Sequence, residues 1–138
     1  MAKLLEDRIK LPSLAEDDGA VTVDKIVFAV QRIVEIANPV RVVAFGSRAR
    51  GDHRKTSDLD LAVIVDRYDK KRDPRPVWRA DLDVWMDMDV VVYDTERESA
   101  LRDSPVSLQS EVAREGIVVY DRTKGFVDRE VAARLVQR

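Results

Sequence analysis

Apolar residues recur at helical spacing in two stretches of the chain, and an aspartate precedes each stretch. After Asp24 the apolar positions are Ile26, Val27, Val30, Ile33, Val34 and Ala37. This spacing predicts an amphipathic helix that Asp24 caps and that Asn38 and Pro39 end. Within 127–138, Asp128 precedes a second apolar series, formed by Val131, Ala132, Leu135 and Val136. The pattern predicts a second helix there, with these side chains facing the core.

Four short apolar runs favour strands. They cover residues 40–45, 58–65, 86–93 and 117–120, and each is too short for a typical helix. A short helix is expected over 47–50, and another is expected to start at Ser107 and to end at Gly116. A further short helix is expected from the apolar positions Val77, Trp78, Leu82 and Trp85. Strands that alternate with helices predict an α/β (α+β) fold, a small mixed β-sheet flanked by helices.

The chain of 138 residues is predicted to form a single domain, with its core over about 24–121 and the C-terminal helix over 127–138. Residues 3–18 lack periodicity and are expected to be loosely held, and the charged segment 66–76 is expected to be an exposed loop. The two tryptophans are expected to pack on the core; exposed instead, they would form a contact surface for a partner. The last helix is expected to complete the core or to form a dimer contact.

Composition excludes several classes of protein. Hydrophobic residues make up 45% and charged residues 36% of the chain, which is typical of a globular protein. The net charge of −2 argues against binding nucleic acid through bulk positive charge. The absence of cysteine excludes disulfides and thiolate catalysis, and the single histidine, His53, excludes a multi-histidine metal site. His53 itself is expected to be a solvated loop residue, since Asp52, Arg54 and Lys55 surround it.

The sequence also bears on where the protein works. No apolar run approaches the roughly 20 residues that a membrane helix needs. The first eight residues carry charges where a signal peptide would be apolar. We therefore expect a soluble, cytoplasmic protein without a membrane partner.

The first candidate site is the turn between the first predicted strand and the short helix that follows it. Its sequence over 46–51 is Gly-Ser-Arg-Ala-Arg-Gly. A glycine lets a ligand approach the backbone closely, and the free N–H groups at a helix start bind phosphate oxygens. Gly46 and Ser47 therefore predict a phosphate-binding turn. Arg48 could add a charge-assisted hydrogen bond to phosphate, as could Arg50.

The second candidate site is a pair of carboxylates, Asp58 and Asp60, at the start of the second predicted strand. Because side chains alternate along a strand, both lie on one face. Two like charges this close raise each other's pKa unless a cation lies between them. Mg²⁺ binds one or two carboxylates and completes its shell with water and phosphate oxygens. The pair therefore predicts a magnesium site beside the phosphate-binding turn.

A third carboxylate is expected from the third predicted strand, where Asp87 and Asp89 share a face. If this strand lies beside the second one, either side chain can join the pair. Three carboxylates around two divalent ions suit in-line phosphoryl displacement, and one of them can accept the proton of the attacking hydroxyl. Asp89 adjoins the apolar run and is expected to be the drier of the two. The alternation of side chains along a strand does not decide between Asp87 and Asp89.

Together these motifs resemble the signature of the DNA polymerase β-like nucleotidyltransferases. They are most similar to the minimal nucleotidyltransferase group, which is often paired with a HEPN partner protein in bacteria and archaea. The resemblance covers about residues 24–121 and implies the nucleotidyltransferase fold. It also implies roles for six residues. The catalytic metal ligands are Asp58, Asp60 and Asp89, and the nucleotide-binding residues are Gly46, Ser47 and Arg48.

The resemblance implies an enzyme that uses Mg²⁺ and ATP to move a nucleoside monophosphate to a hydroxyl, releasing pyrophosphate. In minimal members the acceptor is a tyrosine of the HEPN toxin, so the leading hypothesis is a protein adenylyltransferase that acts as an antitoxin. Two alternatives stay open: a non-catalytic antitoxin that inhibits its partner by contact alone, and a transferase for a small molecule such as an aminoglycoside. A haloacid-dehalogenase-type phosphatase is excluded, because its aspartate pair follows an apolar strand whereas Asp58 and Asp60 precede one.

Overall fold

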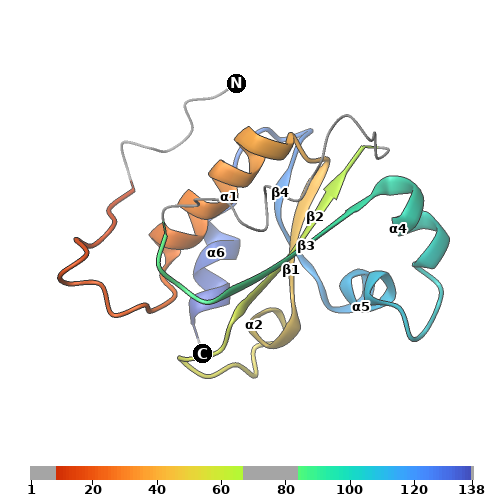
Figure 1. Ribbon diagram of the computed structural model, residues 1–138. Helices are drawn as coiled ribbons and strands as arrows, with labels where there is room; N and C mark the ends of the chain where they lie inside the picture. The colour runs from red at the N-terminus through yellow and green to blue at the C-terminus, as the bar shows by residue number, and fades with distance from the viewer. Residues whose placement is uncertain (1–8, 67–83, 138) are drawn as a thin grey trace.

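A four-stranded mixed sheet organises residues 9–66 and 84–137, the part of the chain that the computed structural model describes (Figure 1). Its strands are β1 (Arg41–Phe45), β2 (Leu59–Val65), β3 (Met88–Asp94) and β4 (Ile117–Asp121). Their order is β3-β2-β1-β4, with β1 antiparallel to β2 and β4, and β2 parallel to β3. The four strands and the mixed sheet confirm the prediction. The parallel pair brings the starts of β2 and β3 to the same edge of the sheet.

Helices cover both faces of the sheet, as Figure 1 shows. The helices are α1 (Val23–Ala37), α2 (Gly46–Arg50), α4 (Thr95–Leu101), α5 (Leu108–Glu115) and α6 (Arg129–Val136). The apolar faces of α1 and α6 pack against alternate strand residues such as Leu59, Leu61 and Val63. The strand residues that alternate with these, including Ala62 and Ile64, point to the opposite face of the sheet. They belong to a smaller cluster with Val112 of α5. Asp60 shares this second face, because it stands two positions before Ala62 on β2.

Side-chain caps start four of the described helices, and two of these caps confirm the prediction. Ser107 accepts a hydrogen bond from the backbone N–H of Ser110 at the start of α5, and Asp128 caps α6. For α1 the expected cap was wrong. Thr22, not Asp24, accepts from the backbone N–H of Lys25, at 3.2 Å. Asp24 lies in the first turn of α1 and forms an ion pair with Arg129 of α6, which joins the two helices on this face.

The pattern of apolar residues missed α4. Its sequence is Thr-Glu-Arg-Glu-Ser-Ala-Leu and none of its residues is buried, so it has no apolar face to detect. Asp94 caps it, accepting from the backbone N–H of Arg97 at 2.8 Å. Gly116 does end α5, but with φ −70° rather than in the left-handed conformation. A Cβ at Gly116 would lie 2.3 Å from the Val112 carbonyl oxygen and 2.4 Å from Val43 Cγ1, so space demands the glycine there.

The described part of the segment before α1, residues 9–22, is held more firmly than its sequence indicated, and residues 3–8 of the predicted lead-in lie outside the described residues. Lys25 is buried, and its Nζ forms an ion pair with Asp17 Oδ1 at 2.6 Å. The same Nζ donates to the carbonyl oxygens of Ala20 at 2.7 Å and of Trp85 at 2.9 Å. The Lys25 hydrogen bond holds the pKa of Asp17 below its usual range. One ammonium group thus ties the lead-in, α1 and the approach to β3 together.

The expectations for the tryptophans and for the charged loop with the short helix after it have different outcomes. Trp85 is 57% exposed, so its expected packing on the core was wrong. The loop predicted over 66–76 lies outside the described residues apart from Asp66, as do Val77, Trp78 and Leu82 of the expected short helix. Within the described ranges, no helix has both the length and the apolar character needed to cross a membrane.

Candidate active site

Asp60 and Asp89 stand side by side on neighbouring strands. They are register partners in the parallel pair of β2 and β3. Paired strands lie about 4.8 Å apart, and the side chains of register partners point to the same face. On its other side Asp60 is the register partner of Phe45, the last residue of β1. The structure therefore brings two of the predicted carboxylates together, beside the end of β1.

The turn that leaves β1 presses directly against Asp60. Gly46 follows Phe45 and has φ +74°, in the left-handed region that favours glycine. A Cβ added there would lie 2.2 Å from Asp60 Oδ2, closer than any side chain can approach. The next residue, Ser47, belongs to α2 and is partly buried. The predicted phosphate-binding turn thus lies on the same side of the sheet as the predicted metal site.

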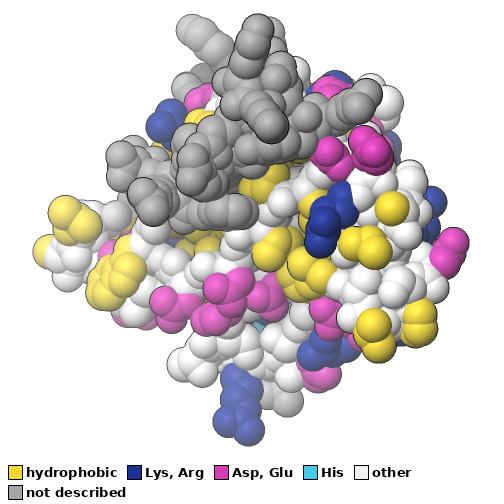
Figure 2. All heavy atoms as spheres, turned by 45° about the vertical axis from the view of Figure 1, so that its right-hand side comes forward, with side chains coloured by type: hydrophobic (Ala, Val, Ile, Leu, Met, Phe, Trp, Pro, Cys, Tyr) yellow, Lys and Arg dark blue, Asp and Glu magenta, His cyan; other side chains and the backbone are white. Residues whose placement is uncertain are grey.

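Several charges converge on Asp60. Burial, the largest cause, and the nearby carboxylates of Asp89, Asp58 and Glu111 together raise its pKa to about 6, while Arg50 lowers it. Figure 2 brings the α4 and α5 side forward and shows acidic side chains gathered in a row on it. Glu111, from α5, was not among the predicted site residues. Its position depends on the packing of α5 beside α2 and β1, which no local pattern reveals.

The carboxylates of the site can supply part of the ligand shell of a divalent cation. Across 9–66 and 84–137, no three His, Cys, Asp or Glu side chains form a group that could hold a metal ion by themselves. Mg²⁺, however, takes one or two carboxylates and completes its shell with water and phosphate oxygens. Two adjacent carboxylates, one of them with a raised pKa, fit that requirement, because a cation relieves their repulsion. Convergence of all three carboxylates, Asp58 included, stays a prediction.

Strand register, rather than burial, distinguishes Asp89 from Asp87 as the candidate third carboxylate. Both residues are exposed, so burial does not separate them, and the expectation that Asp89 is the drier of the two stays a prediction. Asp89, however, pairs with Asp60 and raises its pKa, whereas Asp87 is not among the groups that do so. The backbone oxygen of Asp87 accepts from the N–H of Leu59 at 3.0 Å. These observations favour Asp89 as the third carboxylate.

Arg48 points into the protein. Its side chain is only 3% exposed, and burial lowers its pKa while the nearby Asp58 raises it. The guanidinium donates to the carbonyl oxygens of Ser57 at 3.0 Å, Leu135 at 2.9 Å and Lys55 at 3.0 Å. That Arg48 contributes to nucleotide binding stays a prediction, and such a contribution would act through the backbone groups that it holds.

Arg50 has the opposite orientation. Its side chain is exposed and forms ion pairs with Asp52 at 3.2 Å and with Glu115 of α5 at 3.1 Å. It is also the cation that lowers the pKa of Asp60. Exposed ion pairs of this kind are weak, so the guanidinium is free to exchange partners. Of the two arginines in the turn, Arg50 is therefore the one whose charge faces the carboxylates.

His53 is buried, contrary to the expectation of a solvated loop residue. It is 2% exposed, and its Nε2 lies 3.3 Å from the backbone oxygen of Val136. Nδ1 has no hydrogen-bond partner. The sequence around His53 is charged and suggested solvent, but the end of α6 covers the ring. The loop between α2 and β2 is thus packed on the C-terminal helix.

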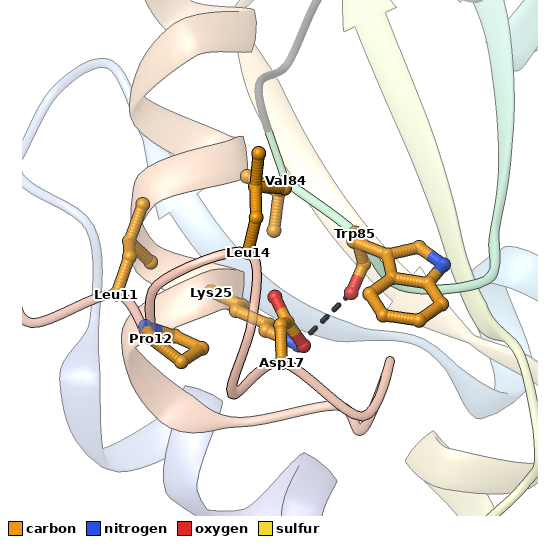
Figure 3. A pocket seen from close by; sticks show the side chains of 7 residues that line it. All are labelled: Leu11, Pro12, Leu14, Asp17, Lys25, Val84 and Trp85. Atoms are coloured by element: carbon orange, nitrogen blue, oxygen red, sulfur yellow. Dashed lines mark hydrogen bonds and ion pairs between the residues drawn. The ribbon is translucent and has the colours of Figure 1, made fainter.

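A hollow lies before β3, away from the carboxylates of the candidate site, and Figure 3 shows the side chains around it. It has a volume of about 530 Å³ and is lined by Leu11, Pro12, Leu14, Asp17, Lys25, Val84 and Trp85. Leu14 is 89% and Trp85 is 57% exposed. Large apolar side chains that face solvent together mark a contact surface more often than scattered ones do. This surface adjoins the segment that leads to Asp89.

The raised pKa of Asp60 has a consequence for stability in the absence of metal and nucleotide. Because its pKa is about 6 in the folded protein and 3.8 in the unfolded chain, the folded state binds more protons between these values. The free energy of unfolding should therefore fall as pH rises from about 4 to about 6, by about 1 kcal/mol after allowance for solvent screening. Chemical denaturation at a series of pH values, with Asp60→Asn as the reference, measures this difference. Parallel pH curves for the two proteins would contradict it.

Comparison with known proteins identifies the class of protein that this fold and site define, the nucleotidyltransferases. The sequence model of the family described as "Polymerase beta, Nucleotidyltransferase" matches residues 29–125, a range that includes every candidate site residue. The chain belongs to this family. A comparison with curated proteins gave no significant match.

One solved structure shows the same fold, and two others are similar at lower TM-scores. A candidate nucleotidyltransferase from Sulfolobus solfataricus is 21% identical, with a TM-score of 0.54 over 76% of this chain and 85% of that one. A toxin–antitoxin structure with AMP-PNP is 21% identical, with a TM-score of 0.44 over 78% and 82% of the two chains. A mutant of the toxin–antitoxin pair MntA-HpeT is 19% identical, with a TM-score of 0.43 over 78% and 81%.

Proposed function

We propose that this protein transfers a nucleoside monophosphate, AMP from ATP, to a hydroxyl group in a reaction that needs Mg²⁺. Membership of the nucleotidyltransferase family supports the reaction class. The observation that carries the proposal is the pair of Asp60 and Asp89 on adjacent strands, with the backbone of Gly46 against Asp60. A phosphate-binding turn and a divalent-cation site in contact are what transfer from a nucleoside triphosphate requires.

Each part of the site has a role in this proposal. The backbone N–H groups at Gly46 and Ser47 and the Ser47 hydroxyl hold phosphate oxygens of the nucleotide. Asp58, Asp60 and Asp89 would hold Mg²⁺, which, when bound, neutralises charge on the triphosphate. Arg50 gives up its exposed carboxylate partners and adds positive charge beside the phosphates.

A residue of this chain also accepts the proton that the acceptor hydroxyl loses. The acceptor oxygen attacks the α-phosphorus, its new bond to phosphorus forms, and the bond to the β-phosphate oxygen breaks so that pyrophosphate leaves. Asp89 is exposed and takes the proton of the acceptor hydroxyl. The neighbouring Asp60, which is less exposed, would hold the cation.

The proposed acceptor is a tyrosine of a HEPN-type toxin, which the transfer silences, so that this chain acts as its antitoxin. The motif over 46–60 supports this assignment through its resemblance to minimal nucleotidyltransferases. The exposed apolar surface of Leu14 and Trp85, beside the segment that leads to Asp89, supports an acceptor that is itself a protein. An interface between two proteins uses exposed aromatic side chains of this kind.

Incubation of the purified protein with α-labelled ATP, Mg²⁺ and the protein encoded beside it tests the proposal. The expected result is one AMP on a tyrosine of the partner, found by mass spectrometry and lost when that tyrosine is changed to phenylalanine. Inhibition of the partner without added mass would favour a contact-only antitoxin. Transfer to an aminoglycoside, with no label on the partner, would favour a small-molecule enzyme.

A further inference from the structure

One buried guanidinium joins three parts of the chain around the candidate site. Arg48 directly follows Ser47 of the phosphate-binding turn. Its Nε donates to the carbonyl oxygen of Ser57, the residue before Asp58, at 3.0 Å. Its Nη1 donates to the carbonyl oxygen of Leu135, at the end of α6, at 2.9 Å. The turn, the start of the carboxylate strand and the C-terminal helix therefore meet at a single side chain.

The loop between α2 and β2 depends on these contacts. Arg48 Nη2 donates to the carbonyl oxygens of Lys55 at 3.0 Å and Arg54 at 3.4 Å, and both of these residues are exposed. Most side chains of the loop lie in solvent and offer the core little. The exception is His53, whose Nε2 lies 3.3 Å from the backbone oxygen of Val136. Arg48 and His53 thus tie the loop to two successive carbonyl groups of the C-terminal helix.

The anchor for these ties is rigid. Leu135 is fully buried in the main core, and α6 packs on α1. A guanidinium presents five N–H donors in a fixed planar fork, whereas the ammonium of lysine is a single point on a flexible stem. Only arginine at this position can reach the loop, Ser57 and α6 at the same time. The relative positions of Ser47 and Asp58 are set by that fork.

We propose that Arg48 is a positioning residue: it holds the phosphate-binding turn and the start of the carboxylate strand in register on the end of α6 and does not itself contact the triphosphate. This inference rests on the proposed function, since the positioned groups are those that bind nucleotide and cation. It assigns the C-terminal helix a part in substrate binding, although α6 contributes no side chain to the site. A residue that orients binding groups in this way commonly changes affinity by roughly 10- to 100-fold when it is replaced.

The variant Arg48→Lys tests the inference, with Arg134→Lys on the exposed side of α6 as the matched control. Hydrogen exchange is measured on the nucleotide-free proteins, and titration calorimetry gives the affinity for ATP in the presence of Mg²⁺. In Arg48→Lys, exchange should accelerate at the loop amides of Asp52, Arg54 and Ser57, which are hydrogen-bonded in the structure. The dissociation constant for ATP should rise roughly 10- to 100-fold. The control should match the wild-type protein in both measurements.

Each other result overturns the inference. Weaker ATP binding with unchanged loop exchange would mean that Arg48 contacts phosphate directly. Accelerated exchange throughout the protein, with unchanged affinity at low temperature, would mean that Arg48 serves the fold alone. In the transfer reaction the inference further predicts a larger rise in KM for ATP than fall in kcat, because unfolding alone lowers the apparent kcat and leaves KM unchanged.

If Arg48→Lys does not fold, His53→Leu removes the hydrogen-bonding ring, and with it one of the two ties, and keeps the guanidinium. Local acceleration of exchange over 52–57, with a smaller loss of ATP affinity, supports the inference. Unchanged exchange in that loop overturns it. Failure of the wild-type protein to bind ATP would overturn the proposed function instead, and the exchange pattern would still decide whether Arg48 positions the loop.

Discussion

Asp60→Asn is expected to lower kcat/KM for nucleotidyl transfer by roughly a thousandfold while making the metal-free protein more stable at pH 7. Activity falls because the substitution removes a charged oxygen between Asp89 and the backbone of Gly46, where the cation and the phosphates are proposed to meet. Stability rises because burial and the neighbouring carboxylates disfavour the charged form of Asp60. The expected gain is about 1 kcal/mol, or about 3 °C in melting temperature. Steady-state kinetics and thermal unfolding measure the two effects.

A substitution that lowers activity but raises stability identifies a functional carboxylate, whereas replacing a structural carboxylate lowers stability. Asp66→Asn is the matched control, because Asp66 follows the far end of β2 and forms an exposed ion pair with Arg122. This control should change neither transfer nor melting temperature appreciably. Loss of both activity and stability in Asp60→Asn would show that Asp60 supports the fold, and retained transfer would remove it from the mechanism.

Gly46→Ala is expected to cost roughly a hundredfold in transfer. The new methyl group would lie 2.2 Å from Asp60 Oδ2, so either the carboxylate or the turn has to move. Either movement separates the proposed phosphate site from the proposed cation site. The φ of +74° adds strain of about 1 to 2 kcal/mol for a residue with a side chain. Kinetics and chemical denaturation together separate the two contributions.

Gly125→Ala is the control for backbone strain. Gly125 has φ +77°, close to that of Gly46, but a Cβ there would meet nothing within 4 Å. The two variants should lose similar stability from strain, and only Gly46→Ala should lose transfer. Equal loss of transfer in both variants would contradict a special role for the close approach between Gly46 and Asp60.

Local patterns in the sequence were sufficient for the four strands and for the positions of Asp60 and of the turn at Gly46. Strand β2 is an apolar run with turn residues before it, and its period of two places Asp60 on one face whatever the rest of the chain does. A glycine between a strand and a short helix predicts the turn at Gly46 in the same way. What the pattern could not supply was the pairing of β2 with β3, which made the choice of Asp89 conditional.

The features that sequence patterns missed depend on contacts between distant segments. Arg48 is itself charged and His53 lies between charged residues in the sequence, yet both are buried against carbonyl groups more than 80 positions away. Glu111 approaches Asp60 only because α5 packs beside α2 and β1. For these three residues the deciding interaction lies outside the window in which periodicity is read. Helix α4 was missed for a local reason, because it has no buried residue and therefore no apolar period, and its start is marked only by the cap at Asp94.

The central claim is that the Asp60 and Asp89 carboxylates and the backbone at Gly46 and Ser47 bind one metal–nucleotide complex. A crystal structure with Mn²⁺ and a non-hydrolysable ATP analogue tests it most directly, because anomalous scattering locates the metal independently of the protein. The account predicts a metal peak in contact with both carboxylates, with the triphosphate against Gly46 and Ser47. A metal and triphosphate bound elsewhere, or Asp60 and Asp89 turned away from both, would contradict it.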